Sequence, residues 1–378
     1  MMITKSELYI HIPFCVRKCL YCDFLSFNAD EKTKEKYIDA LCEELMFIGK
    51  ERCKTSLSSV FIGGGTPSVL PADQMVRVMD CVKENFTLDH DAEVTMECNP
   101  GTVDEEKMKA YFACGINRIS FGLQSVHDDE LKKLGRIHTY EDFLKSYEAA
   151  VKAGFTNINV DLMSDIPGQS VDSWTKTLRT VCELKPSPAH ISAYSLIVEE
   201  GTPFAEMADE GKLDIPDEDT DREMYHMTSG ILSEYGYGRY EISNYAKKGR
   251  ECRHNLGYWT GVTYYGAGLG AASYYEGCRF TNTSELSVYM DDPIDSFKLD
   301  EKLTNADKMS EFMILGLRLT KGVDPAEFKE RFCRDLSGVY GREIERFKAE
   351  GLLIEENGRI HLTEKGLDLA NHVMQAFI

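Results

Sequence analysis

The chain has 378 residues, of which 43% are hydrophobic and 28% are charged, a composition typical of a globular protein with one large domain and a smaller one. Acidic side chains outnumber basic ones by 63 to 43, and the net charge of -20 argues against a nucleic-acid partner. No stretch approaches the roughly eighteen uninterrupted apolar residues of a membrane-spanning helix, and the N-terminus lacks a signal-peptide pattern. We therefore expect a cytoplasmic protein whose cysteines stay reduced.

Short runs of β-branched and aromatic residues alternate with longer segments of helical spacing through residues 1–200. The runs cover residues 7–12, 59–64, 92–98, 117–122, 156–162 and 189–195. Strand followed by helix, about six times over, predicts an α/β fold with a parallel sheet. Roughly 190 residues for six units favours a partial (β/α)6 barrel of TIM type over an open doubly wound sheet.

The pattern changes after residue 200. An acidic segment at 216–223 precedes a run rich in aromatic residues and glycine at 257–275, and we assign residues 201–298 to an extension of the barrel. From residue 299 to 378, segments of helical spacing lead into a short hairpin. This order predicts a small, mainly helical C-terminal domain of winged-helix type, with a boundary near 295 to 305.

Three of the twelve cysteines, Cys15, Cys19 and Cys22, form a C-x3-C-x2-C motif directly after the first predicted strand. A reducing compartment disfavours a disulfide. Three thiolates cannot complete a tetrahedral zinc site without a fourth ligand, whereas a [4Fe–4S] cube held by three cysteines leaves one iron open to an exogenous ligand. The other nine cysteines lack this spacing, and we expect Cys42, Cys53 and Cys333 to lie in the core.

Polar residues or glycines also follow the next four predicted strands, where the catalytic groups of a βα barrel lie. They are the glycine-rich GGGTPS at 63–68, Glu97, Gln124 with Arg136 twelve residues later, and Asp161. Taken singly, a glycine triplet is more often a tight turn, and a carboxylate or arginine is more often a cap or a solvated charge. Their joint placement favours a ligand site.

The cysteine motif, with an aromatic residue at Tyr21, resembles that of the radical S-adenosylmethionine (SAM) superfamily, whose open iron binds the amine and carboxylate of SAM. Further segments, among them ECNPGT, VDLMSDIPGQ and HNLGYWTG, resemble the coproporphyrinogen dehydrogenase-like proteins and in particular their haem-chaperone branch. The resemblance runs from about residue 7 to the end. It implies a [4Fe–4S] cluster, one or two SAM molecules, and haem as cargo.

The resemblance also implies roles for individual residues. The cluster ligands would be Cys15, Cys19 and Cys22. A first SAM molecule would contact Tyr9, Gly64 and Glu97, and a second would contact Tyr21, Gly65, Thr66, Gln124, Arg136 and Asp161. In the haem-chaperone branch the HNLGYW segment is linked to haem binding, which makes His254 a candidate axial ligand beside the flat rings of Tyr258 and Trp259. The alternative is a hydrogen-bonded histidine near an aromatic cluster.

Two departures distinguish the chain from the dehydrogenases that it resembles. Phe24 stands where those enzymes have a further cysteine, and the long arm that precedes their motif is missing. We therefore expect a haem chaperone that delivers haem to acceptor haem proteins, membrane respiratory ones among the candidates. The alternative is an oxygen-independent coproporphyrinogen III dehydrogenase, and a radical SAM enzyme acting on RNA is disfavoured by the acidic charge.

Other partners follow from the same resemblance. It implies a small electron-donor protein such as flavodoxin or ferredoxin. The sequence leaves open whether the chain is an enzyme, whether it forms a homodimer and whether it associates transiently with a membrane.

Overall fold

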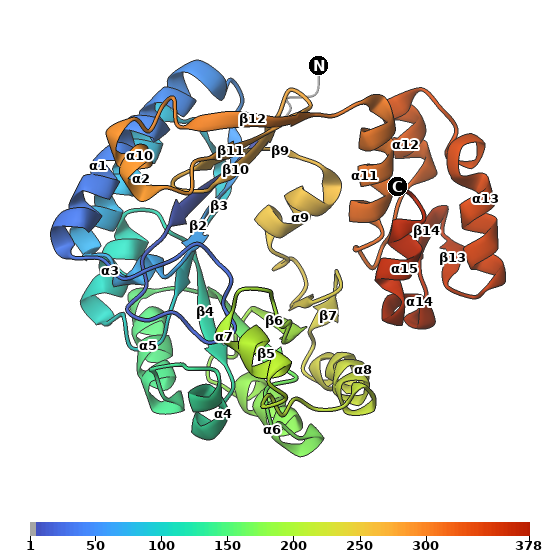
Figure 1. Ribbon diagram of the computed structural model, residues 1–378, viewed down its shortest axis with the longest axis horizontal. Helices are drawn as coiled ribbons and strands as arrows, with labels where there is room; N and C mark the ends of the chain where they lie inside the picture. The colour runs from blue at the N-terminus through green and yellow to red at the C-terminus, as the bar shows by residue number, and fades with distance from the viewer. Residues whose placement is uncertain (1–4) are drawn as a thin grey trace.

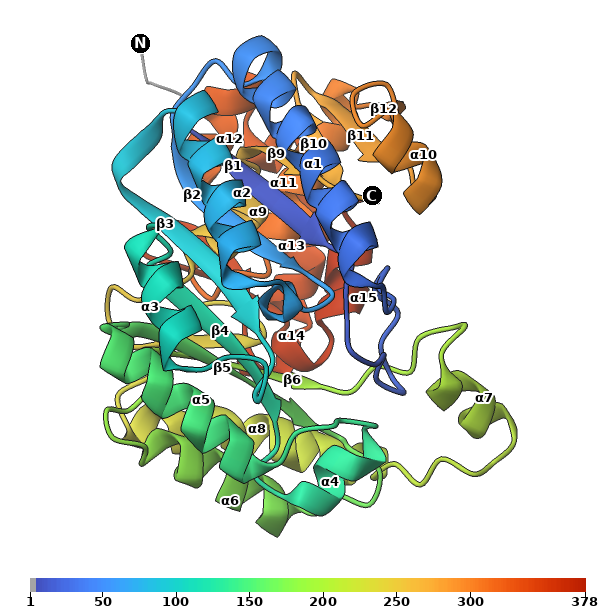
Figure 2. The same ribbon diagram turned by 90° about the vertical axis from the view of Figure 1, so that its left-hand side faces the viewer.

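The computed structural model describes residues 5–378, so the first four residues of the expected barrel lie outside the described part. Six parallel strands lie side by side in chain order: β1 (Ser6–Ile12), β2 (Leu57–Gly64), β3 (Leu88–Cys98), β4 (Arg118–Gln124), β5 (Asn157–Ser164) and β6 (His190–Ser195). Helices α1 (Glu31–Phe47), α2 (Ala72–Asn85), α3 (Glu105–Ala113), α4 (Asp128–Lys133), α5 (Tyr140–Ala153) and α6 (Val171–Cys182) connect them and cover the outer face (Figures 1 and 2). The predicted partial (β/α)6 barrel is confirmed.

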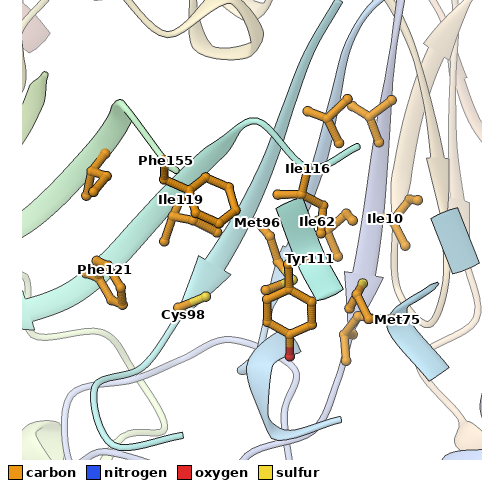
Figure 3. Close-up of a cluster of buried hydrophobic side chains, with 14 of the residues drawn as sticks. Ile10, Ile62, Met75, Met96, Cys98, Tyr111, Ile116, Ile119, Phe121 and Phe155 are labelled. Carbon is orange, nitrogen blue, oxygen red and sulfur yellow. The ribbon is translucent and has the colours of Figure 1, made fainter. Parts of the chain in front are cut away.

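The two faces of the curved sheet differ in polarity because side chains alternate along each strand. Ile10, Ile62 and Met96 belong to the same apolar core as Met75 of α2 and Tyr111 of α3, on the outer face of the sheet (Figure 3). The alternate positions face the barrel interior and carry many polar side chains: Glu7, Ser59, Glu93, Thr95, Glu97, Arg118, Ser120, Asn159 and Asp161. The barrel interior is therefore chemically suited to a site.

Residues 201–302 extend the sheet at both ends. At one end β9 (Thr263–Ala267) pairs in parallel with β1, and β10 (Ala272–Tyr275), β11 (Cys278–Asn282) and β12 (Phe297–Lys302) follow as an antiparallel meander. At the other end β8 (Asn244–Ala246) pairs with β6, and β7 (Gly238–Arg239) with β8. The helices of this region are α7 (Pro203–Asp209), α8 (Glu218–Glu234), α9 (Arg253–Thr260) and α10 (Leu286–Asp291), and α9 lies on the concave side of the sheet (Figure 1).

The C-terminal domain has its own apolar core, which includes Met313, Phe328, Phe347 and Val373. Its elements are α11 (Asn305–Gly316), α12 (Pro325–Phe332), α13 (Leu336–Ala349), the hairpin β13 (Leu353–Glu356) and β14 (Arg359–Leu362), α14 (Glu364–Asp368) and α15 (Ala370–Gln375). Three helices followed by a hairpin is the predicted order. The last strand of the large sheet, β12, ends at Lys302, so residue 299 lies inside that strand.

Two further observations concern the helices and the cysteines. Within residues 5–378, none of the helices combines the length and the apolar character needed to span a membrane. Cys53 is buried and Cys42 is half-buried, but the prediction that Cys333 lies in the core is wrong. Cys333 is exposed just after α12, where the helix ends in the left-handed conformation with φ of 53°.

Candidate cofactor site

A cavity of about 360 Å³ opens at the carboxyl ends of the parallel strands. Of the residues predicted from the sequence, it is lined by Cys15, Cys19, Tyr21, Cys22, Gly64, Gly65, Thr66, Glu97, Gln124, Arg136 and Asp161. These residues come from the loops or ends of five strands, which meet here because the strands are parallel. Tyr9 and His254 are the two predicted residues that do not line the cavity.

The loop between β1 and α1 carries the three cysteines, and backbone hydrogen bonds hold it in place. The Cys15 amide donates to the Phe27 carbonyl at 2.9 Å, and the Phe27 amide donates to the Pro13 carbonyl at 2.9 Å. The Leu20 amide donates to the Leu134 carbonyl after α4 at 3.0 Å. The loop is thus tied to itself and to the far side of the cavity, while the cysteine thiols stay free and partly exposed.

The donor set fits an iron–sulfur cube that is held by three cysteines. Cys15, Cys19 and Cys22 lie on one loop, form no disulfide and line the same cavity. A [4Fe–4S] cube bound by three thiolates leaves one iron open to a further ligand. Burial raises the pKa of the Cys22 thiol, and the neighbouring thiols of Cys19 and Cys15 raise it further. A cation bound among these thiols would lower their pKa values and take the place of their protons.

The glycines after β2 are required by close packing rather than by a simple turn. Gly64 has a φ of 109°, and a Cβ there would lie 2.4 Å from the His11 ring. A Cβ on Gly65 would lie 2.7 Å from the Phe14 carbonyl oxygen. The Gly64 amide donates to the Glu97 carboxylate at 3.1 Å. A side chain at either position would therefore collide with β1 or with the loop that follows it.

Two largely buried carboxyl groups line the cavity near each other. Burial, together with the nearby charge of Asp161, raises the pKa of Glu97 to about 8. Burial also raises the pKa of Asp161, although Ser120 Oγ donates to it at 3.0 Å and Asn159 Nδ2 at 2.7 Å. Buried acids of this kind gain from a bound ligand that donates hydrogen bonds or carries positive charge.

A hydrogen-bonded chain connects four loops around the cavity. Arg136 Nη1 donates to Asn99 Oδ1 at 2.8 Å, and Asn99 Nδ2 donates to Thr66 Oγ1 at 2.7 Å. Arg136 Nη2 donates to the Tyr21 hydroxyl at 2.9 Å. The sequence interpretation missed Asn99, although it lies in the ECNPGT segment directly after the third strand.

Tyr194 at the end of β6 is a second cavity residue that the sequence interpretation missed. Its hydroxyl donates to Gln124 Oε1 at 2.9 Å, and Gln124 holds a positive φ of 72°. Tyr194 lies inside the predicted sixth strand, the one strand end for which no site residue was proposed. Inspecting that strand end in the same way as the others would have found it.

Tyr9 lies in the barrel below the cavity. Its hydroxyl is 3.0 Å from His11 Nδ1, and its ring stacks on Phe61 at 6.4 Å between centroids. His11 in turn packs against Gly64. Tyr9 lies near the cavity residue Glu97 but does not itself line the cavity, and its contact with a first SAM molecule stays a prediction.

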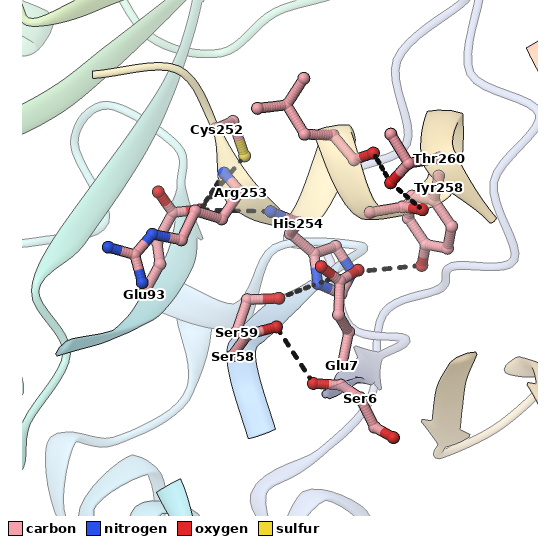
Figure 4. Close-up of polar contacts among 12 residues, drawn as sticks. Ser6, Glu7, Ser58, Ser59, Glu93, Cys252, Arg253, His254, Tyr258 and Thr260 are labelled. Carbon is pink, nitrogen blue, oxygen red and sulfur yellow. Dashed lines mark hydrogen bonds and ion pairs between the residues drawn. The ribbon is translucent and has the colours of Figure 1, made fainter. Parts of the chain in front are cut away.

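His254 lies at the start of α9, deep in the barrel, with 1% of its surface exposed. Its Nδ1 is 2.9 Å from Ser59 Oγ and 3.6 Å from the Glu7 carboxylate, and its Nε2 is 3.2 Å from the Tyr258 hydroxyl (Figure 4). Burial lowers the pKa of His254 to about 3, helped by the Arg118 charge, so the ring is neutral. In this structure His254 is buried and hydrogen-bonded, as the alternative interpretation expects, and its role as an axial ligand stays a prediction.

A groove of about 480 Å³ separates the barrel from the C-terminal domain. Trp259, at the end of α9, and Tyr274 line the barrel side, and Phe312 lines the opposite side. The indole Nε1 of Trp259 is buried without a hydrogen-bond partner among the described residues. Lys308 and Arg331 also line the groove. Three acidic side chains, Glu276, Glu311 and Glu327, line it as well, so the groove combines aromatic surface with charges of both signs.

The comparisons with known proteins agree with this geometry. The family model of the radical SAM superfamily matches residues 9–181, and that of the HemN C-terminal domain matches residues 303–369. The protein named heme chaperone HemW in Bacillus subtilis is 36% identical to this chain over 377 residues, and the match covers 99% of each chain. The protein of the same name in Escherichia coli is 35% identical over 384 residues, and the match covers 100% of this chain and 99% of the relative.

A solved structure of coproporphyrinogen III oxidase (HemN) from Escherichia coli superposes with a TM-score of 0.86 at 23% identity, covering 99% of this chain and 90% of that chain. At this identity the likeness concerns the fold. The identity to the HemW proteins extends over the whole chain, and the chain therefore belongs to the HemW family of the radical SAM superfamily.

Proposed function

We propose that this protein is a haem chaperone that holds a [4Fe–4S] cluster and SAM at the ends of the barrel strands and passes haem to acceptor haem proteins. One observation carries the proposal: three free cysteines on one loop share a cavity with a glycine loop and two buried carboxyl groups. The similarity of the whole chain to proteins named heme chaperones supports it.

The residues on different sides of the cavity would bind different cofactors. Cys15, Cys19 and Cys22 would hold the cluster, which when bound would supply an electron and one open iron. The Glu97 carboxyl and the backbone at Gly64 would hold the first SAM molecule by hydrogen bonds. The residues on the Arg136 side of the cavity, Tyr21, Gly65, Thr66, Gln124, Arg136 and Asp161, would hold a second. A small electron-donor protein would reduce the cluster.

For the haem cargo we propose the groove between the barrel and the C-terminal domain. Trp259, Tyr274 and Phe312 supply apolar surface, and burying it against a macrocycle is favourable by about 25 cal/mol per Å². Lys308 and Arg331 would pair with the two propionates of haem. The groove includes the end of the HNLGYW segment, which connects this proposal with the segment singled out in the sequence.

The buried position of His254 separates two versions of the haem proposal. Both ring nitrogens of His254 face protein partners, so iron ligation by His254 requires α9 to leave Ser59 and Glu7. Binding in the groove requires no such movement. The two versions therefore differ in which substitutions weaken haem binding.

The test is a haem titration of the cluster-loaded protein under anaerobic conditions, followed by transfer to an acceptor haem protein. We expect Trp259→Ala and Lys308→Ala to weaken haem binding several-fold and leave the iron–sulfur absorbance unchanged. Lys329→Ala is the matched control, because Lys329 lies exposed on the same domain and pairs with Asp335. A shift of the haem spectrum in His254→Ala alone would favour ligation by His254 after a movement of α9.

The dehydrogenase alternative is tested with the same preparation. Incubation with coproporphyrinogen III, SAM and a reductant should give no divinyl product. Turnover at a rate that scales with SAM would contradict the chaperone proposal and support the oxygen-independent dehydrogenase.

A further inference from the structure

Two cysteines outside the cofactor cavity lie together on the outer face of the barrel. Cys42 belongs to α1 and Cys81 to α2, two helices that pack side by side (Figures 1 and 2). The Cys81 thiol donates to the Cys42 carbonyl oxygen at 3.2 Å, so the two residues lie against each other across the helix contact. Both are half-buried and line a surface depression with Arg77 and Asn85. Small reagents can therefore reach them.

The two thiols have different environments. The neighbouring Cys42 side chain lowers the pKa of Cys81, with help from the Asn85 amide, 3.7 Å from the sulfur, and from the Arg77 charge, whereas burial and the Glu84 charge oppose this shift. The neighbouring Cys81 side chain raises the pKa of Cys42. Cys81 is thus suited to be the attacking thiolate, with Cys42 beside it to complete an exchange.

We propose that Cys42 and Cys81 form a reversible dithiol–disulfide site that exchanges with low-molecular-weight disulfides of the glutathione class. Cys81 loses its proton to solvent, and its thiolate attacks one sulfur of the small disulfide, whose other half leaves as a thiolate. Cys42 then loses its proton to solvent and attacks Cys81 Sγ, which releases the second small thiol and forms the protein disulfide. Two protein thiols are oxidised and one small disulfide is reduced to two thiols.

The position of this pair links it to the cofactor cavity. Helix α1 begins after the loop that carries the cluster cysteines, and α2 begins after the glycine loop that follows β2. A bond between the two helices therefore connects the elements that follow both loops. The inference depends only on the thiol pair and stands apart from the proposed haem function.

Peptide mapping tests the proposal on the cluster-loaded protein, in which the cysteines of the C-x3-C-x2-C motif are protected. The protein is incubated anaerobically with oxidised glutathione, alkylated and digested with trypsin, which releases Cys42 in residues 37–50 and Cys81 in residues 78–83. We expect a linked pair of these peptides that dithiothreitol separates. Cys42→Ser should retain a stable glutathione adduct on Cys81, because the second exchange is blocked.

Two control variants make the test decisive. Cys81→Ser should react several-fold more slowly at Cys42, whereas Cys333→Ser should still give the linked peptides, since Cys333 lies alone on the surface of the C-terminal domain. Full alkylation of both peptides in protein with normal iron–sulfur absorbance would overturn the proposal. Equal reactivity of Cys42→Ser and Cys81→Ser would also overturn it, because the two thiols would then be two equivalent buried side chains.

Discussion

Arg136 and Tyr21, 115 positions apart in the chain, are joined by a hydrogen bond of 2.9 Å across the cofactor cavity. The contact ties the loop after β4 to the loop that carries the cluster cysteines. Arg136 also donates to Asn99, so one guanidinium orders two of the loops that line the cavity.

Replacing Arg136 by Ala should weaken SAM binding about 10- to 100-fold, because hydrogen bonds to a charged group contribute about 1.5–3 kcal/mol. The substitution removes the donor to both Asn99 and Tyr21. Calorimetric titration of the cluster-loaded protein with SAM measures the change. Tyr21→Phe removes only a hydroxyl and should cost less. Wild-type affinity in Arg136→Ala would show that the cavity does not hold SAM through this network.

The cluster assignment predicts a difference between two sets of cysteines. Changing Cys15, Cys19 or Cys22 to Ala should remove most of the iron–sulfur absorbance after anaerobic reconstitution, because a cube with two protein ligands is poorly held. Cys53→Ala, in the core, and Cys333→Ala, on the surface, should retain it. Similar losses from both sets would contradict the assignment.

Glu7 predicts a pH-dependent loss of stability. Burial raises its pKa to about 8 from an ordinary value of 4.5, and the Glu93 charge adds to this. The folded state therefore keeps a proton that the unfolded chain releases, so stability falls as the pH rises from about 4.5 to about 8 and stays lower above that range.

The test of the Glu7 prediction is Glu7→Gln in the protein without cluster. Its free energy of unfolding should exceed that of the wild type by about 5 kcal/mol at pH 9, and by only about 1 kcal/mol at pH 5. Urea unfolding at both pH values measures it. A difference of the same size at both would mean that Glu7 is ionised in the folded protein.

The substitution Gly257→Ala tests how much the contact between α9 and β1 contributes to the stability of the protein. A Cβ on Gly257 would lie 2.1 Å from the Glu7 carboxylate, so Gly257→Ala should destabilise the protein by about 1–3 kcal/mol. Gly230→Ala is the matched control in helix α8, where nothing lies within 4 Å, and it should stabilise by about 0.5–1 kcal/mol. Thermal unfolding compares the two. Equal melting temperatures would show that α9 is not packed tightly on Glu7.

Local chemistry explains what the sequence by itself determined. Cys15, Cys19 and Cys22 lie within eight positions, so their spacing indicates a shared ligand before any folding is considered. The six strands follow from alternating apolar residues, and parallel strands bring Glu97 and Asp161 to one end of the barrel. These features depend on short-range periodicity and on one rule of topology.

Contacts between distant segments decided the rest. Asn99 and Tyr194 became cavity residues because the loops and strand ends bring them against Arg136 and Gln124. His254 is buried because α9 lies inside the barrel, where Gly257 leaves room for the Glu7 side chain, and no pattern in HNLGYW reports this. Such pairings depend on how long-range packing sets side chains against one another, and only the tertiary structure contains that information.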